Sequence, residues 1–151
     1  MIGELLPRRA DNTYRGHKLA LWIFGLLLLM KAAIGVNSIV NGRSVAVSAD
    51  GIPLDAFTPA GANAFVSAFA LLGLSHVMAS LLGVIVLLRY RTLVPLVFAF
   101  LLLQHLSSRW ILRVMPIARI GTPPAVGVNL VLLALIVVGL ALSLWIRNER
   151  A

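Results

Sequence analysis

Cysteine and charged residues are what this sequence most clearly lacks. It contains no cysteine, which excludes disulfides, thiolate metal sites and cysteine nucleophiles together. Only 12% of its 151 residues are charged, about half of the roughly 25% that is typical of a soluble domain. With 60% hydrophobic residues, the chain could not cover the surface of a water-soluble fold. The composition therefore predicts an integral membrane protein.

Acidic residues are scarcer still: five Asp and Glu stand against 13 Lys and Arg, for a net charge of +8. A basic excess of this size can indicate nucleic-acid binding, but here the basic residues do not form a stripe with aromatic residues between them. They lie between and beside long apolar runs, as expected for loops at a membrane surface. We expect a lipid bilayer as the partner, and no nucleic acid.

Four apolar runs are each long enough to cross a bilayer, which takes about 20 apolar residues in a helix. They cover approximately residues 19–40, 62–88, 93–112 and 125–146. Pro95 falls in the first turn of the third run, where its missing N–H does no harm. The pattern predicts an all-α fold, with residues 1–151 forming a single transmembrane domain built as a four-helix bundle.

The basic residues also predict the orientation of the bundle. Eight share one side, namely Arg8, Arg9, Arg15, Lys18, Arg89, Arg91, Arg147 and Arg150. Four lie on the other, namely Arg43, Arg109, Arg113 and Arg119. Because cytoplasmic loops carry the excess of Lys and Arg, we expect both termini in the cytoplasm. The first run has features of a signal peptide, but a lysine interrupts it and the small-residue site lies too far from its apolar core.

Small residues on the first two runs predict where the helices touch. They recur at helical spacing as Lys31, Gly35, Ser38 and Gly42 on the first run and Gly73, His76, Ser80 and Gly83 on the second. Since small residues let transmembrane helices approach closely, both stripes should face the interior. The outer connection at about 41–61 is long, and its SADGIP segment favours turns over a further helix. We expect a structured outer loop there.

Lys31 lies near the middle of the first run and so near the bilayer midplane. A lysine at that depth costs about 2.5–3.5 kcal/mol on insertion scales, and no predicted span contains an acid. Three environments remain open: hydrogen bonds to Gln104, Ser75 or backbone carbonyls, a water-filled cavity, or a bound anionic or carbonyl ligand. An ionisable residue inside a membrane marks a functional site by default.

His76 and His105 fall at similar depth on neighbouring runs, and two facing imidazoles could ligate a b-type haem. Against this, the short turn between the two runs predicts that their helices pack directly, with little room for a porphyrin. The alternative is two polar residues bonded across a helix pair. A transition-metal site has no third ligand among the spans, so we expect no metal.

A basic rail follows along the third run. His105, Arg109 and Arg113 advance by four residues each, and Arg119 lies beyond them in the next loop. Such a rail could bind a phosphate, a lipid headgroup or a carboxylate. The simpler alternative is that Asp50 and Asp55 of the outer loop pair with these arginines. Both interpretations predict that the loop folds down over the end of the third helix.

Several short motifs together resemble a known group of proteins. They are the lysine and glycines of the first run, the Leu-Ser-His of the second, LLRYRTLVPL, and the Gln-His and arginine end of the third. This plan resembles small four-helix families of the bacterial inner membrane, the DoxX-like proteins among them. The resemblance implies a multi-pass protein of that membrane with a link to quinone-dependent oxidation or an accessory role in redox complexes, but no catalytic motif residue carries over. GLSHV also partly resembles the Gly-x-Ser motif of rhomboid-type proteases, but His76 stands where a glycine is expected.

The sequence thus predicts a non-catalytic accessory or ligand-holding protein that packs with itself or with a larger membrane complex. Its interior site, around Lys31, His76, Gln104 and His105, would hold a quinone- or lipid-like molecule. The alternatives are a haem redox protein and a bundle that conducts protons or ions through Lys31. A visible spectrum distinguishes the haem alternative, and flux into liposomes distinguishes conduction.

Overall fold

The structure is a computed structural model that describes residues 9–145. Within that range it contains helices, 3-10 turns and connections, and no strand. The elements in chain order are α2 (Lys18–Val40), α3 (Gly42–Ser48), η1 (Leu54–Ala56), α4 (Pro59–Arg89), η2 (Arg91–Leu93), α5 (Val94–Val114) and α6 (Ala125–Leu144). Four of these, α2, α4, α5 and α6, are long and apolar enough to cross a membrane. The predicted all-α fold is confirmed for this range, and each of the four predicted apolar runs forms one of these helices.

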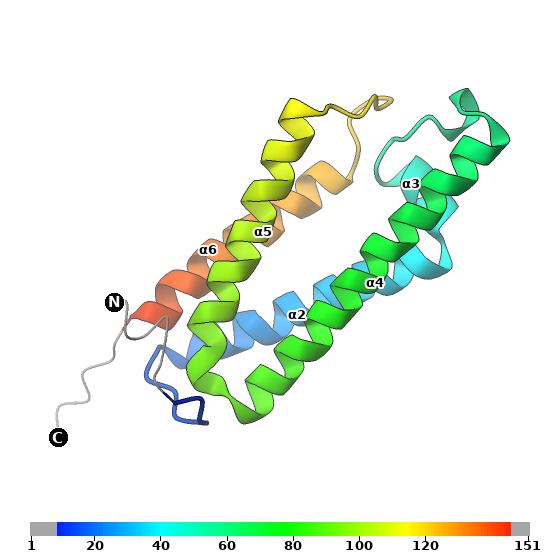
Figure 1. Cartoon of the computed structure of the whole chain (residues 1–151). Coiled ribbons are helices and arrows are strands. Elements are labelled where there is room, and N and C mark those ends of the chain that lie inside the picture. The colour runs from blue at the N-terminus through cyan, green and yellow to red at the C-terminus, as the bar shows by residue number, and fades with distance from the viewer. Residues whose placement is uncertain (1–8, 146–151) are drawn as a thin grey trace, which may run out of the picture.

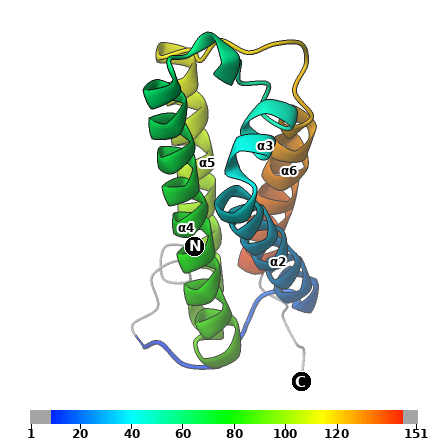
Figure 2. The ribbon, with the colours of Figure 1, turned by 90° about the vertical axis from the view of Figure 1, so that its right-hand side faces the viewer.

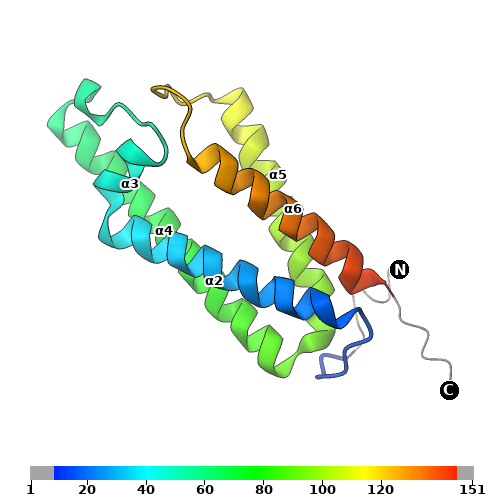
Figure 3. The same cartoon turned by 180° about the vertical axis from the view of Figure 1, so that it is seen from behind.

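The long helices run side by side and share two ends. The start of α2, the α4–α5 turn and the end of α6 lie together at one end, here called the turn end (Figure 1). The α2–α4 and α5–α6 connections lie at the other, here called the loop end (Figures 1 and 3). The helices pack in the order α4–α2–α6–α5, and α4 and α5 make few contacts with each other. From their shared turn, α4 and α5 diverge toward the loop end (Figures 1 and 3).

This divergence corrects one prediction. The short turn was expected to hold α4 and α5 together as direct neighbours along their length. Instead, the most extensive contact of the bundle joins α2 to α4, and α5 packs chiefly against α6. The turn fixes only the first residues of α5, where Pro95 occupies the first helical turn as predicted.

The turn half of the bundle is closed by an apolar core. Ten buried residues of all four long helices form it, and Phe24, Leu27, Phe98 and Ile136 have no exposed surface. The rings of Phe24 and Phe98 lie 5.2 Å apart, tilted by 58°, a favourable aromatic geometry. The segment before α2 ties this end together, because the Thr92 N–H donates to the carbonyl of Asp11 at 3.3 Å.

Helices α2 and α4 touch through their small residues, as predicted. Gly35 and Gly73 are both buried, and a methyl group placed on Gly35 would lie 2.6 Å from the carbonyl oxygen of Gly73. Ser38 and Ser80 are buried on the same two stripes. The backbones therefore approach as closely as glycine allows.

The loop end differs from prediction in two respects. Residues Gly42–Ser48 form helix α3, whereas turns were expected throughout the outer connection. The expected turns are confined to the part that follows, around Gly51, which adopts a positive φ of 67°. The loop packs on the α5–α6 connection rather than on the end of α5 itself: the Ile120 N–H donates to the Gly51 carbonyl at 2.8 Å, and the Ala125 N–H to the Ala49 carbonyl at 3.1 Å. Figure 2 shows α3 beside the start of α6.

Candidate functional site

A cavity of about 370 Å³ lies between the four long helices, on the loop-end side of the apolar core. Its lining comprises Lys31, Ile34, His76, Gln104, His105, Ser108, Arg109, Leu112, Val126, Asn129, Leu130 and Leu132. We call it the central cavity. The cavity forms at this position because α5 diverges from α4 beyond their shared turn and stays packed against α6 (Figure 1). Its volume falls within the range of small-molecule sites, about 300–1,000 Å³.

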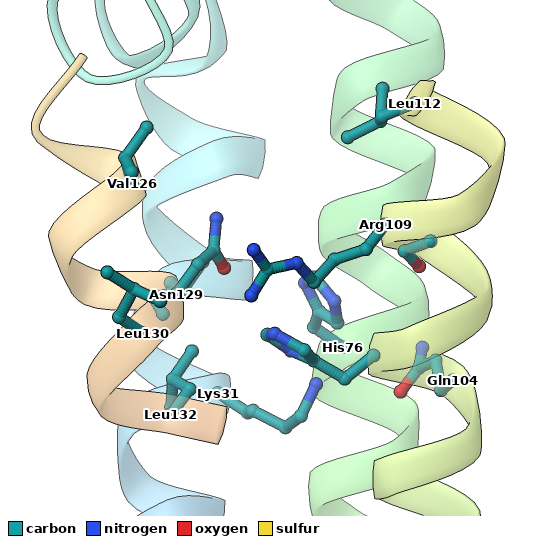
Figure 4. A pocket seen from close by; sticks show the side chains of 12 residues that line it. Lys31, His76, Gln104, Arg109, Leu112, Val126, Asn129, Leu130 and Leu132 are labelled. Atoms are coloured by element: carbon teal, nitrogen blue, oxygen red, sulfur yellow. The ribbon is translucent and has the colours of Figure 1, made fainter. Parts of the chain in front are cut away.

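Helix α5 supplies most of the polar lining. Gln104, His105, Ser108 and Arg109 follow one another at helical spacing, so they share one face of the helix. That face looks across the cavity toward α6, which contributes Asn129 (Figure 4). Ser108 was missed in the sequence, although its position four residues after Gln104 was a usable signal. Asn129, in the first half of α6, was also not predicted as a site residue.

Lys31 enters the cavity from α2. Figure 4 shows its chain extending from that helix into the space between the four helices. Among residues 9–145, its amine donates to no hydrogen-bond acceptor, so the expected bonds to Gln104, Ser75 or backbone carbonyls do not form. Of the three environments open to Lys31, the structure shows a cavity, in which water or a ligand would surround the amine. The predicted interior site around this amine therefore has a physical space.

The two interior histidines also meet at this cavity, His76 from α4 and His105 from α5. The Nε2 atom of His105 is buried, with no hydrogen-bond partner in the described part of the chain. A buried nitrogen without a partner costs free energy, about 1–3 kcal/mol in mutational data. Such an orphaned group is the kind that a bound molecule or an ordered water satisfies.

Arg109 occupies the loop-end side of the cavity. Its guanidinium extends from α5 toward Asn129 on α6 (Figure 4). The same side chain lines a second, more open pocket of about 560 Å³ at the loop end, here called the outer pocket. Its lining comprises Leu106, Arg109, Trp110, Leu112, Arg113, Pro116, Ile117 and Arg119. Arg113, predicted as a candidate ligand-binding residue of the basic rail, lines the outer pocket and not the central cavity.

Ser75 is the predicted site residue that the structure removes from the cavity. It is exposed on α4, and its hydroxyl donates to the Leu71 carbonyl of the same helix at 3.1 Å. His76, the next residue, points the other way into the cavity lining. Successive residues on a helix are about 100° apart, and here His76 takes the cavity side of α4 while Ser75 takes the exposed side.

The acidic residues of the outer loop take two different positions. Asp50 is half-buried, and burial raises the pKa of its carboxyl above the usual 3.8, while the nearby Arg119 charge acts in the opposite direction. Asp55 lies elsewhere, in a surface pocket that it shares with Arg43. Of the predicted loop pairings, the structure supports Asp50 with Arg119, because the arginine charge acts on that carboxyl.

Within residues 9–145, no group of three or more His, Cys, Asp and Glu side chains is placed to hold a metal ion. Comparison with known proteins yields no match: no protein-family model, curated protein or solved structure is similar to this chain. The DoxX-like resemblance stays a prediction.

Proposed function

We propose that this protein is a non-catalytic, ligand-holding membrane protein whose central cavity binds the polar head of a quinone- or lipid-like molecule. The observation that carries the proposal is the cavity itself: a space between four apolar helices that is lined by Lys31 and by His105, whose Nε2 has no hydrogen-bond partner in the described part of the chain. Placing ionisable groups inside a bilayer costs free energy, so such groups generally mark functional sites. A head group that accepts hydrogen bonds would satisfy both side chains.

The apolar part of the lining supports an amphipathic ligand over a small polar solute. Ile34, Leu112, Val126, Leu130 and Leu132 surround the polar residues. Ligand sites generally combine an apolar wall with a few placed polar groups, which fix orientation. A molecule with a polar head and an apolar body matches both components, and the surrounding lipid is its natural source.

An accessory role within a larger assembly is part of the same proposal. Every residue from 106 to 118, the loop-end half of α5 and its following segment, is exposed in the single chain. No other described element covers this stretch, although it includes polar residues at membrane depth. A second copy of the chain or another membrane polypeptide would cover it.

A matched pair of serines tests the ligand-holding function. The full chain is purified in a mild detergent and extracted with organic solvent, and retained molecules are identified by mass spectrometry. We expect the wild type and Ser75→Leu, altered on the exposed face of α4, to retain the same molecule. Ser108→Leu, which puts a larger side chain at the cavity lining, should lose most of it. Equal retention by both variants, or none by the wild type, would contradict the proposal.

Haem binding is the second candidate, and the divergence of α4 and α5 favours it. Direct packing of these helices was the argument against a porphyrin, and the helices make few contacts. His76 and His105 both line the central cavity, so bis-histidine ligation has a location. A Soret band in the purified protein that disappears in the His76→Ala/His105→Ala double variant would establish haem. A colourless protein with a bound quinone or lipid would exclude it.

A further inference from the structure

The charges that face the central cavity all have the same sign. Lys31 and Arg109 are its charged residues, and His76 and His105 are its other ionisable residues. The acids in the described range are Asp11, Asp50 and Asp55, and none of them lines the cavity. Lys31 at membrane depth without a counter-ion is unfavourable, and the like charge of Arg109 on the same cavity repels it.

A bound anion would remove this penalty, and Arg109 has the geometry to select one. A guanidinium presents paired N–H donors that match the oxygens of a phosphate or carboxylate, and it remains charged in any protein environment. Gln104, Ser108 and Asn129 add neutral donors around the same space. A neutral carbonyl compound would accept hydrogen bonds from these groups but would leave both positive charges uncompensated.

The outer pocket connects this arrangement to the loop end. It shares Arg109 and Leu112 with the central cavity, and it adds the guanidinium groups of Arg113 and Arg119. In the sequence the interior polar site and the basic rail are two separate features. The structure joins them through the side chain of Arg109, so that basic groups continue from the loop end to the middle of the bundle.

We propose that the central cavity is an anion site: it takes a phosphate or carboxylate group, which reaches Arg109 by way of Arg113 and Arg119 in the outer pocket. This inference rests on the proposed ligand-holding function and narrows its ligand to an anionic one. The group is carried by an amphiphile whose apolar part lies against Ile34 and Leu132, or it is free in solution. Both sources share the chemistry that the site recognises.

Binding measurements on the purified full chain in a neutral detergent test the inference. The probes are a short-chain phosphatidic acid, the phosphatidylcholine of equal chain length, inorganic phosphate, and a neutral short-chain quinone. We expect phosphatidic acid to bind at least tenfold more tightly than the phosphatidylcholine and the quinone, since charge-assisted hydrogen bonds are the stronger ones. Inorganic phosphate with comparable affinity would support the anion site and identify a free anion as the source, while much weaker phosphate binding would identify the amphiphile.

Variants assign the binding to the residues. Arg109→Gln should weaken phosphatidic acid binding about tenfold or more, and Arg109→Lys, which keeps the charge but loses the paired donors, should weaken it less. The control is Arg43→Gln, a loop-end arginine that lines neither the cavity nor the outer pocket, and it should bind as the wild type does. Should Arg109→Gln fail to fold, the Arg109→Lys variant and the weakening of wild-type binding by added salt still decide the question.

The failures can be told apart. A quinone that binds more tightly than phosphatidic acid, with an affinity indifferent to Arg109→Gln, overturns the anion site and leaves the ligand-holding function in place. Failure of every probe to bind, with no retained molecule in the purified protein, overturns both.

Discussion

The Lys31 side chain leaves α2 about midway along the helix, and its amine enters a cavity that no described acid lines. In an isolated α2 this amine would be exposed to lipid, and in the bundle the surrounding helices separate it from lipid. Its neighbours His76, Arg109 and Asn129 offer a polar surface but no negative charge. At this scale the requirements of folding and of ligand binding oppose each other.

Replacing Lys31 with methionine should therefore stabilise the ligand-free protein. Methionine is similar in length and unbranched, and it removes an ammonium group that has no hydrogen-bond acceptor in the described structure. We expect the melting temperature in detergent to rise by a few degrees, which corresponds to about 1 kcal/mol, while ligand retention falls. Lys18→Met, at the exposed start of α2, is the control and should retain ligand. A lower melting temperature for Lys31→Met would show that the amine makes a stabilising bond.

Asp50 gives a stability effect that depends on pH. Burial raises the pKa of its carboxyl above 3.8, with Arg119 opposing. Above pH 3.8 the unfolded chain releases this proton before the folded one does, so the folded state becomes less stable as pH rises through that window. Asparagine does not titrate. The melting temperature of Asp50→Asn relative to the wild type should therefore increase from pH 3 to pH 7, and a constant or falling difference would contradict this.

At the scale of elements, α2 and α4 form the most closely packed helix pair of the bundle. Its contact is the most extensive of any helix pair, and it depends on the close approach of Gly35 to Gly73. The α5–α6 pair is joined to it by the apolar core of the turn half. The cavity residues are thus held on four helices that pack together around this core.

A glycine pair tests this description. Gly35→Ala would place a methyl group 2.6 Å from the Gly73 carbonyl oxygen, whereas an added methyl at Gly127 on α6 would meet nothing within 4 Å. Both changes gain about 1 kcal/mol of helix propensity, but overpacking at Gly35 costs about 1–3 kcal/mol. We expect Gly35→Ala to lower the melting temperature by a few degrees, and Gly127→Ala to leave it equal or higher. Equal effects of the two variants would mean that the α2–α4 contact is not tight.

The elements were predictable from the sequence to the extent that local physics determines them. Apolar length located the four spans, and helical spacing identified which faces of α2 and α4 meet. Helix α3 was missed because its seven residues are too few for a periodic signal, and the turn chemistry that follows it dominated the prediction. The separation of α4 from α5 could not be predicted, since a short turn constrains only the ends that it joins. Ser75 was placed in the site although it lies about 100° around α4 from His76, and Ser108 and Asn129 were not counted in it.

At the scale of the whole molecule, three layers follow one another along the bundle. The turn end holds an apolar core around Phe24 and Phe98, the middle holds the central cavity, and the loop end holds a small second core around Ala46, Ile52 and Leu54 and, at the end of α5, the outer pocket. A closed apolar layer on one side of a polar cavity suits a site that holds a molecule. It supports conduction less well, because ions would have to cross that layer.

The orientation of these layers in the membrane can be tested with cysteine reporters, because the chain has no cysteine of its own. Positively charged residues gather at the turn end, so we expect that end to face the cytoplasm and the outer pocket to face the opposite side. Asn12 and Ser44 are exposed at the turn end and on α3, respectively. A membrane-impermeant maleimide applied to intact cells should label Ser44→Cys, and it should label Asn12→Cys only after lysis. Ser75→Cys, exposed in the middle of α4, should remain unlabelled in both conditions because lipid covers it. The reverse labelling pattern would put the outer pocket in the cytoplasm, and its anion would then have to come from the cytoplasmic leaflet or the cytosol.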